Sequence, residues 1–316
     1  MKRLKIASLV IPAAMLVLIS SCKKDNPDPT NTTTPPTSGS GISSFFQTNL
    51  NNATQTFTID AGQNQSITGS KGTVVHFYAN SFVTASGAPV TGNIQIELVE
   101  IYGKKDMILL NKQTMGVNGT GLSPLISGGQ FNIVAKQNGQ KLRLANGMGY
   151  SIDAPAPNGT TPQMGVFYGA IANNQLTWTQ ADSAFVNITQ NGYSLFSDST
   201  DWVNLDYFMS TTGPLSKLNV QLPSGISTSD TRVFVSVDGS NTLAGIYQFA
   251  NGVFTTGDYY KLPVGMPVHF IVIDLENNAI KAAIIPSTIT ANHLEVVSSL
   301  TTYTLADLST LLDNLP

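Results

Sequence analysis

FNIVAKQNGQKLRLA, residues 131–145, decides the fold class of this 316-residue chain because it can be tested as a β-hairpin residue by residue. An Asn-Gly pair favours a two-residue type I′ turn, so the loop is placed at Asn138 and Gly139. The resulting apolar pairs across the two strands are Ala135 with Leu142 and Ile133 with Leu144. The opposite face is mostly charged, as expected for an antiparallel pair with one buried face and one face in water.

Two further segments satisfy the same test. With Asn251 and Gly252 as the loop of YQFANGVFTT, the pairs are Phe249 with Phe254 and Tyr247 with Thr256. With an Asn277-Asn278 loop in IVIDLENNAIKAAII, the pairs are Leu275 with Ile280, Ile273 with Ala282, and Asp274 with Lys281 on the other face. Three self-consistent hairpins predict an all-β protein.

The clearest helix signal lies at the C-terminal end, in TLADLSTLLDNL. Thr304 can cap the first turn, and Asp307 follows three residues later. The apolar stripe consists of Leu305, Leu308, Leu311 and Leu312. We therefore expect one short C-terminal helix on an otherwise all-β chain.

The Pro- and Gly-rich loop APAPNGTTP interrupts the strand pattern and predicts a boundary between two β-sandwich units in tandem. The expected organisation is a signal peptide at 1–21, a lipid anchor and tether at 22–44, a first β-sandwich at 45–157, and a second at 158–316 that includes the C-terminal helix.

Several stretches resemble a known family. They are GTVVHFYANSFVTASGAPVTGNIQIELVEIYGKKDMILLNKQT, SGGQFNIVAKQNGQKLRLANG, DWVNLDYF and LPVGMPVHFIVI. Together they resemble uncharacterised Bacteroidota-type lipoproteins with ZU5-like or Ig-like β-sandwich domains. The shared features are strand, turn and glycine spacing, so the resemblance implies a fold and a location but transfers no catalytic residue.

The N-terminus predicts export and lipidation. MKRLK is positively charged, and the uncharged apolar run at 6–21 is too short to span a membrane, which is typical of a signal peptide. Ile19-Ser20-Ser21-Cys22 resembles a lipobox, in which the cysteine receives the lipid. Cys22 is the only cysteine of the chain and has no disulfide partner, which favours lipidation over an ordinary secretory signal.

Composition fits a protein held outside the cytoplasm by a tether. Residues 23–41 contain no aliphatic or aromatic side chain but four prolines, so this segment cannot form a core. Its first residues, CKKDNPD, resemble export signals of some Bacteroidota-type lipoproteins, and we predict anchoring to the outer membrane, on its periplasmic face or at the cell surface. Only 11% of residues are charged and the net charge is −3, which argues against a nucleic-acid partner.

Metal and cofactor sites have only scattered candidates. Oxygen ligands in DSTDWVNLD, from Asp198, Asp201, Asn204 and Asp206, are weak candidates for calcium, with loop capping as the alternative. The histidines, His76, His269 and His293, lie in or beside expected strands and are more typical of packed or solvated side chains than of a metal site. We predict no cofactor.

Three other side chains have two possible roles each. Strict alternation from Ile94 through Leu98 would send Glu100 inward, where it would be a buried, paired carboxylate. We favour the alternative, in which a bulge or strand end near Tyr102-Gly103 breaks the alternation. Trp178 and Trp202 suit either a sugar platform or a core.

No catalytic motif is present, and Cys22 is assigned to lipid. The sequence therefore predicts a non-enzymatic binding or assembly module of the cell envelope, with an envelope protein or glycan as partner. The alternative is a glycan or peptide hydrolase that uses carboxylates.

Overall fold

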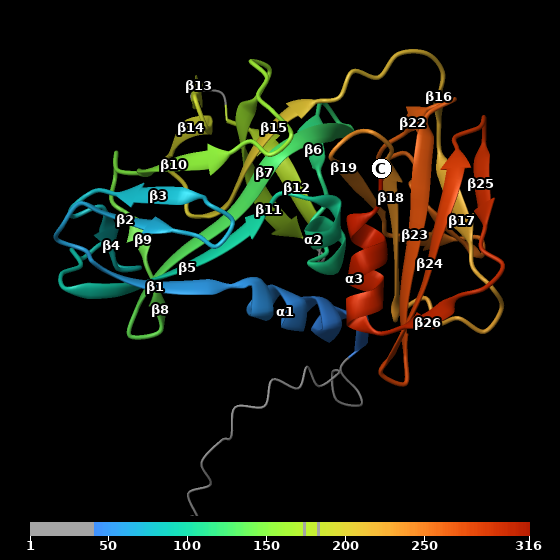
Figure 1. Ribbon diagram of the computed structural model, residues 1–316, viewed down its shortest axis with the longest axis horizontal. Coiled ribbons are helices and arrows are strands. Elements are labelled where there is room, and N and C mark those ends of the chain that lie inside the picture. Colours follow the sequence, from blue (N-terminus) through green and yellow to red (C-terminus); the bar gives the residue numbers. More distant parts are fainter. Residues whose placement is uncertain (1–40, 173–174, 182–183) are drawn as a thin grey trace, which may run out of the picture. The chain divides into compact units, whose positions relative to one another are not determined.

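The computed structural model describes residues 41–172, 175–181 and 184–316. These residues are mostly β, with three helices among them (Figure 1). The predicted C-terminal helix is present as α3 (Leu305–Asp313), and Thr304 caps it by accepting a hydrogen bond from the Asp307 backbone N–H at 3.1 Å. None of the helices in the described ranges combines the length and apolarity that a membrane span requires.

The largest sheet has eight strands in the order β1-β5-β7-β15-β11-β12-β6, with β8 added to β7. Their bounds are β1 (Gln55–Asp60), β5 (Asn93–Ile101), β6 (Met115–Asn118), β7 (Gly121–Gln137), β8 (Gln140–Lys141), β11 (Gly165–Ala172), β12 (Gln175–Gln180) and β15 (Asp201–Phe208). Because β6 pairs with both β12 and β7, five of these strands close into a small ring. Trp178 and Trp202 pack against the bare backbone of Gly169, where any Cβ would collide with them.

A second sheet of five strands completes the first β unit, in the order β13-β14-β10-β3-β2. Its strands are β2 (Gln65–Thr68), β3 (Val74–Phe77), β10 (Tyr150–Pro155), β13 (Val186–Thr189) and β14 (Gly192–Ser197); a short pair, β4 (Phe82–Val83) and β9 (Arg143–Leu144), lies beside it in the chain. Alternate residues of both sheets form one apolar core, which includes Leu98, Phe131, Phe77 and Ile152.

The second β unit consists of a five-stranded and a four-stranded sheet. The first comprises β18 (Thr231–Val237), β19 (Thr242–Ile246), β23 (Pro267–Glu276), β24 (Ala279–Thr288) and β26 (Thr301–Tyr303); the second comprises β17 (Leu218–Gln221), β20 (Gln248–Ala250), β21 (Val253–Thr255) and β25 (His293–Val296). A short pair, β16 (Leu215–Ser216) and β22 (Leu262–Pro263), also occurs. Val235, Phe270, Val220 and Phe254 belong to the core of this unit.

A third core joins the two β units through the helices. It contains side chains of α1 (Gly41–Ala53), α2 (Lys104–Leu109) and α3 together with Phe234 and Ile271 of the second unit and Val99 and Ile101 of the first. Helices α1 and α2 were not expected from the sequence. The predicted tether at 22–44 therefore ends too late, because α1 already begins at Gly41 and buries Ile42 and Phe45.

The hairpin predictions are confirmed at their turns and only in part along their strands. Leu142 donates its backbone N–H to Ala135 at 2.8 Å, but Leu144 then pairs with Phe82 instead of Ile133. Phe249 pairs with Phe254, although the ladder stops before Tyr247. All three pairs around Asn277-Asn278 are present, and both asparagines have positive φ, as a type I′ turn requires.

The predicted boundary between 157 and 158 does not separate two sheets. β10 before it pairs with β14 after it, and β7 pairs with β15. The strands that follow the Pro- and Gly-rich loop return to the first unit because their inward residues, such as Val166 and Val203, complete its core. The first β unit therefore extends through β15, and the second begins at β16.

Candidate functional site

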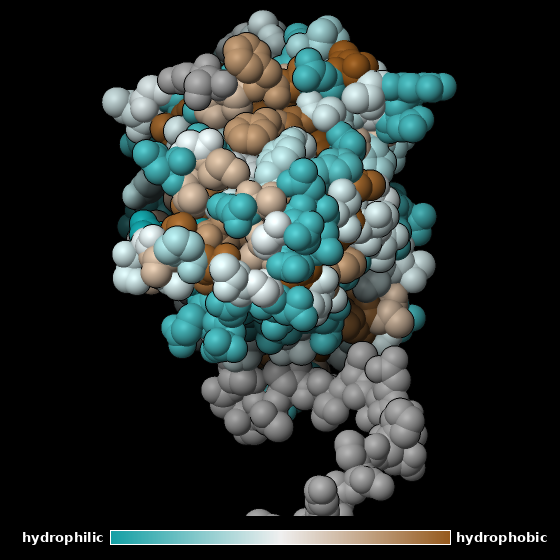
Figure 2. Space-filling view, turned by 90° about the vertical axis from the view of Figure 1, so that its left-hand side faces the viewer, coloured by the Kyte–Doolittle hydropathy of each residue, from teal (hydrophilic) through white to brown (hydrophobic). Residues whose placement is uncertain are grey.

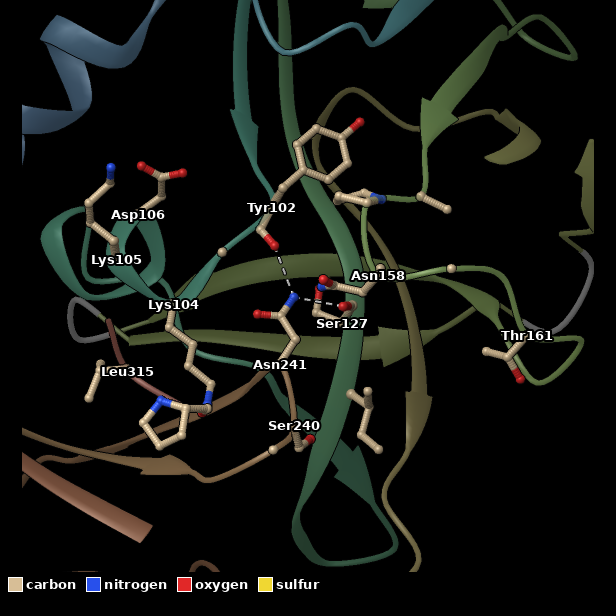
Figure 3. Close-up of a pocket in the computed structure, with 18 of the residues that line it drawn as sticks. Tyr102, Lys104, Lys105, Asp106, Ser127, Asn158, Thr161, Ser240, Asn241 and Leu315 are labelled. Atoms are coloured by element: carbon tan, nitrogen blue, oxygen red, sulfur yellow. Dashed lines mark hydrogen bonds between the residues drawn. The ribbon is translucent and has the colours of Figure 1, made fainter. Parts of the chain in front are cut away.

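A cavity of about 800 Å³ lies where the end of β5, the β10–β11 loop, the β18–β19 turn and the end of α3 meet (Figure 3). We call it the α2 cleft. It is lined mainly by residues of the segments 102–106, 126–128, 156–161, 239–241 and 312–316. Backbone groups and uncharged polar side chains, such as those of Asn158, Thr161 and Ser240, provide much of the lining.

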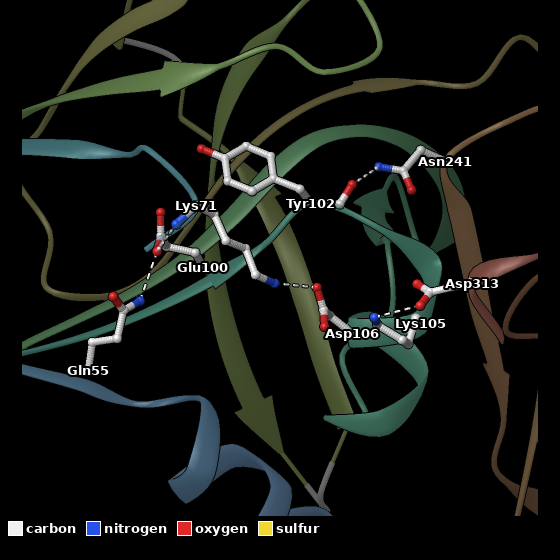
Figure 4. Close-up of polar contacts among 8 residues, drawn as sticks. All are labelled: Gln55, Lys71, Glu100, Tyr102, Lys105, Asp106, Asn241 and Asp313. Carbon is white, nitrogen blue, oxygen red and sulfur yellow. Dashed lines mark hydrogen bonds and ion pairs between the residues drawn. The ribbon is translucent and has the colours of Figure 1, made fainter. Parts of the chain in front are cut away.

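Three consecutive charged residues at the start of α2 contact three different parts of the chain. The Lys104 ammonium donates to the Val237 carbonyl oxygen at 2.6 Å and also to the carbonyl oxygen of Pro316. Lys105 pairs with Asp313 of α3 at 2.8 Å, and Asp106 pairs with Lys71 of the β2–β3 turn (Figure 4). This six-residue helix therefore links the first β unit to the second and to α3.

Lys104 is largely withdrawn from water. Its residue is only 9% exposed, and this burial lowers the pKa of its ammonium to about 8, although the carboxylate of Asp238 opposes the shift. Burial disfavours the charged form of a lysine, and the two carbonyl acceptors compensate only in part. The Lys104 side chain therefore connects α2 to β18 and to the C-terminal end of the chain at the wall of the cleft.

Asn241 fixes the floor of the cleft. Its side-chain N–H groups donate to the carbonyl oxygens of Tyr102 at 3.0 Å and Ser127 at 2.7 Å, as Figure 3 shows. The backbone N–H of Ser127 donates in return to the Asn241 carbonyl oxygen at 3.1 Å. Next to it, the hydroxyl of Thr242 donates to Leu125 at 2.8 Å. The β18–β19 turn is therefore bound to β5 and β7 by directional hydrogen bonds.

Glu100 binds the β2–β3 turn, whose Lys71 pairs with Asp106 of the cleft lining. The Glu100 carboxylate accepts hydrogen bonds from the Gln55 side chain at 2.8 Å and from the backbone N–H of Lys71 at 3.1 Å (Figure 4). It also accepts one from the backbone N–H of Thr73 at 3.0 Å. A Cβ on Gly69 would lie 2.3 Å from this carboxylate, so the turn can approach only because a glycine is present. Glu100 therefore holds the β2–β3 turn, which carries Lys71.

The favoured interpretation of Glu100 as a bulge or strand end is wrong. β5 continues through Ile101, Glu100 pairs with Phe131, and the residue is 3% exposed. Beside it the hydroxyl groups of Tyr102 and Thr73 lie 2.7 Å apart, and burial raises the pKa of Tyr102, with the hydrogen bond to Thr73 opposing the shift. The alternative, a buried carboxylate with partners, is the one that the structure shows.

The acidic side chains of the described cleft lining are paired with lysines. Two carboxylates line the α2 cleft, those of Asp106 and Asp313, and each is already paired with a lysine. The described lining contains no histidine. Both carboxylates therefore take part in ion pairs at the cleft wall.

The calcium candidates do not come together. Asp198 accepts a hydrogen bond from the Tyr168 hydroxyl at 2.7 Å, and Asp201 pairs with Lys141 at 2.5 Å. Asp206 is fully buried and accepts from the Asn204 amide at 2.5 Å. Within the described ranges, no three acidic, histidine or cysteine side chains lie together as a metal site would require. These carboxylates have structural partners instead.

The three histidines also lie apart, each with its own partners. His76 contacts Asp153 at 2.9 Å, His269 contacts Asp238 at 2.7 Å, and His293 stacks on Phe270 with ring centroids 5.1 Å apart. The two tryptophans are core residues: their rings meet edge to face at 6.3 Å, and both are buried. The interpretation as a sugar platform is wrong for this pair.

Cys22, with the rest of the predicted signal peptide and most of the tether, lies outside the described residues. The sequence did not predict the residues that bind the two β units to each other around the α2 cleft, above all Lys104 and Asn241. The only available signal was the charged run KKD at 104–106, which is unusual in a chain with so few charges. This run alone does not indicate that Lys104 and Lys105 bind residues more than a hundred positions away in the sequence.

The sequence matches no protein-family model and no curated protein sequence. Among solved structures, 17 chains match; one is described as Gamma-CGTASE from Alkalophilic bacillus clarkii, is 9% identical, and superposes with a TM-score of 0.17. The match covers 76% of this chain and 40% of that chain, so this chain spans less than half of that structure's length. A TM-score this low does not establish a shared fold.

Proposed function

We propose that the protein is a lipid-anchored, non-enzymatic binding or assembly module of the bacterial outer membrane, and that the α2 cleft holds a segment of its partner, an envelope protein or a glycan. The observation that carries the proposal is the preformed cleft itself: about 800 Å³, with a floor bound by Asn241 and walls bound by α2. A site whose walls are already ordered loses little entropy when it binds a ligand.

The electrostatics of the cleft support an uncharged or hydrogen-bonding ligand segment. The charged side chains at the start of α2 are engaged by Asp313, Lys71 and carbonyl oxygens. What remains for a ligand is backbone amide and carbonyl groups with Asn, Ser and Thr side chains of the two loops. Such groups recognise hydroxyl and amide functions by hydrogen bonding.

The proposal includes a finer description of the fold, two ZU5-like or Ig-like β-sandwiches in tandem. Two separate apolar cores, each enclosed by a pair of sheets, support it. The sandwiches would run from β1 to β15 and from β16 to β26, with the helices between them.

Anchoring through Cys22 is the part of the proposal that concerns location. Cys22→Ser should abolish labelling by a radioactive or alkyne-tagged fatty acid and leave an unprocessed or soluble form in fractionated cells. Ser21→Ala, which keeps the cysteine and a small residue before it, is the matched control. A Cys22→Ser protein that still carries fatty acid in the outer-membrane fraction would refute the anchor.

Binding in the cleft can be tested by site-specific photocrosslinking in cells. A photoreactive amino acid at Asn158, an exposed residue of the cleft loop, should capture a discrete adduct, whereas the same group at exposed Thr228, outside the lining, should not. Mass spectrometry then identifies the adduct as protein or glycan. Equal adducts from both positions, or none from Asn158, would contradict a partner at this cleft.

A further inference from the structure

A second, smaller cavity of about 300 Å³ lies on the outer face of the five-stranded sheet of the first unit. Its lining includes Phe185, Phe196, Ser151, Ser194 and Asn187. We call it the Phe185–Phe196 surface. Figure 2 shows this side of the molecule, where apolar residues gather in its upper part with hydrophilic residues around them.

The two aromatic rings are exposed, and one of them is held in place. Phe185 is 79% exposed and Phe196 is 46% exposed. A Cβ on Gly149 would lie 2.4 Å from the ring of Phe196, so this ring rests directly on the glycine backbone just before β10. Gly149 thus leaves room for a fixed ring that faces solvent.

Polar side chains of the neighbouring strands lie beside the two rings, at positions that pair across the sheet. Ser151 of β10 pairs with Phe196, and Ser194 of β14 pairs with Asn187 of β13, so these side chains share the outer face. At the border, the carboxylate of Asp198 accepts the Tyr168 hydroxyl at 2.7 Å. No lysine or arginine is among the described residues of the lining.

From this arrangement we propose that the Phe185–Phe196 surface binds a neutral saccharide. The faces of aromatic rings carry partial negative charge and pack against the C–H groups of a sugar ring, while hydroxyl, amide and carboxylate groups beside them bond its hydroxyls. A lining with a carboxylate and no cation selects against phosphorylated or acidic ligands.

The size of the cavity favours a saccharide over a folded protein. A volume of about 300 Å³ is at the lower limit of small-molecule pockets, which corresponds to one or two sugar rings. A stable protein partner would need about 800 Å² on this side, far more than two rings and three short polar side chains offer. This surface is distinct from the α2 cleft, and its inference stands without that proposal.

Native affinity electrophoresis of the purified full-length protein in mild detergent tests the inference. The probes are gels that contain laminarin, xyloglucan, galactomannan or dextran, with polygalacturonate as the acidic contrast. At least one neutral polysaccharide should retard the protein, and Phe185→Ala and Phe196→Ala should each weaken that binding at least tenfold. Phe249→Ala removes a ring of similar exposure, 49%, from the second β unit and should change nothing.

Thr228→Ala, at an exposed residue outside both cavities, should also bind normally, which restricts the effect to this surface. Because Phe185 is almost fully exposed, its removal should not affect folding, so this variant decides the outcome if Phe196→Ala lowers Tm. The inference is wrong if none of the four neutral polysaccharides retards the protein, as expected if the surface binds a protein. It is equally wrong if Phe185→Ala binds as well as the parent chain.

Discussion

Two buried carboxyl groups on opposite faces of the eight-stranded sheet have very different surroundings. Glu100 faces the core of the first β unit and accepts three N–H hydrogen bonds, two of them from backbone. Asp206 faces the other side, where it accepts from Asn204, while its Oδ1 has no partner among the described residues. Burial raises the pKa of Asp206 well above its usual value, with hydrogen bonds from Ser127 and Asn204 opposing the shift.

The role of a buried acid therefore depends on the hydrogen-bond donors that surround it. The donors at Glu100 belong to a turn that must be held, so this acid organises backbone. Gln130 pairs with Asn204, two residues before Asp206 on the same strand, and its side-chain amide is also buried without a partner in the described structure. A poorly satisfied polar group of this kind lowers stability.

The largest expected effect is at Glu100. Glu100→Gln replaces one acceptor oxygen with an N–H group that opposes the donors, so the free energy of unfolding should fall by about 3 kcal/mol. Urea denaturation measures it. Glu97→Gln is the matched control on the same strand, because the Glu97 carboxylate contacts only the side chains of Lys136 and Gln95 among the described residues and accepts no backbone N–H. Similar losses in both variants would mean that the three donors to Glu100 have no special importance.

The next effect is a change in pH dependence at Asp206. Since its folded pKa is raised, the folded chain keeps a proton that the unfolded chain releases above about pH 4. Stability should therefore fall as the pH rises from about 4 to the folded pKa, by up to ~1.4 kcal/mol per pH unit.

Asp206→Asn removes that term and should flatten the profile of unfolding free energy against pH. Part of the slope should remain, because burial also raises the pKa of Asp274. Asp274→Asn is therefore the control variant, and it should leave the larger part of the slope unchanged. If Asp206→Asn had the same profile as the parent chain, Asp206 would not titrate abnormally.

The smallest change in unfolding free energy is expected for the ion pair between Lys71 of the β2–β3 turn and Asp106. Lys71 and Asp106 have side chains that are 40% and 25% exposed, so Lys71→Ala should cost about 0.5 kcal/mol or less. The backbone N–H of residue 71 still binds Glu100 in this variant. A loss as large as that of Glu100→Gln would show that the ion pair, and not the carboxylate, holds the turn.

Local features of the fold could be predicted from the sequence, and distant ones could not. The Asn-Gly and Asn-Asn turns and the Thr304 cap depend on neighbouring residues. Helix α1 was missed although Ile42, Phe45 and Phe46 have helical spacing, because its Gly, Ser and Asn residues continue the composition of the tether. The partner of β7 lies beyond a Pro- and Gly-rich loop that reads as a boundary.

The candidate site shows the same limit. Alternation along β5 gave the inward direction of Glu100, but its donors come from Gln55, Lys71 and Thr73 on other segments. Asn241 could not be recognised because an asparagine in a turn usually bonds its own backbone. Here it binds strands of the other β unit.

The pairing of β7 with β15 also bears on how the chain is made. β7 is complete at Gln137, yet the strand that covers one of its edges begins only at Asp201. During synthesis, this seventeen-residue strand therefore presents an unpaired edge for as long as the intervening segment is still emerging. Contacts of such high sequence separation form slowly. The edge of β7 is therefore the place where pairing with another chain must be avoided until β15 has been made.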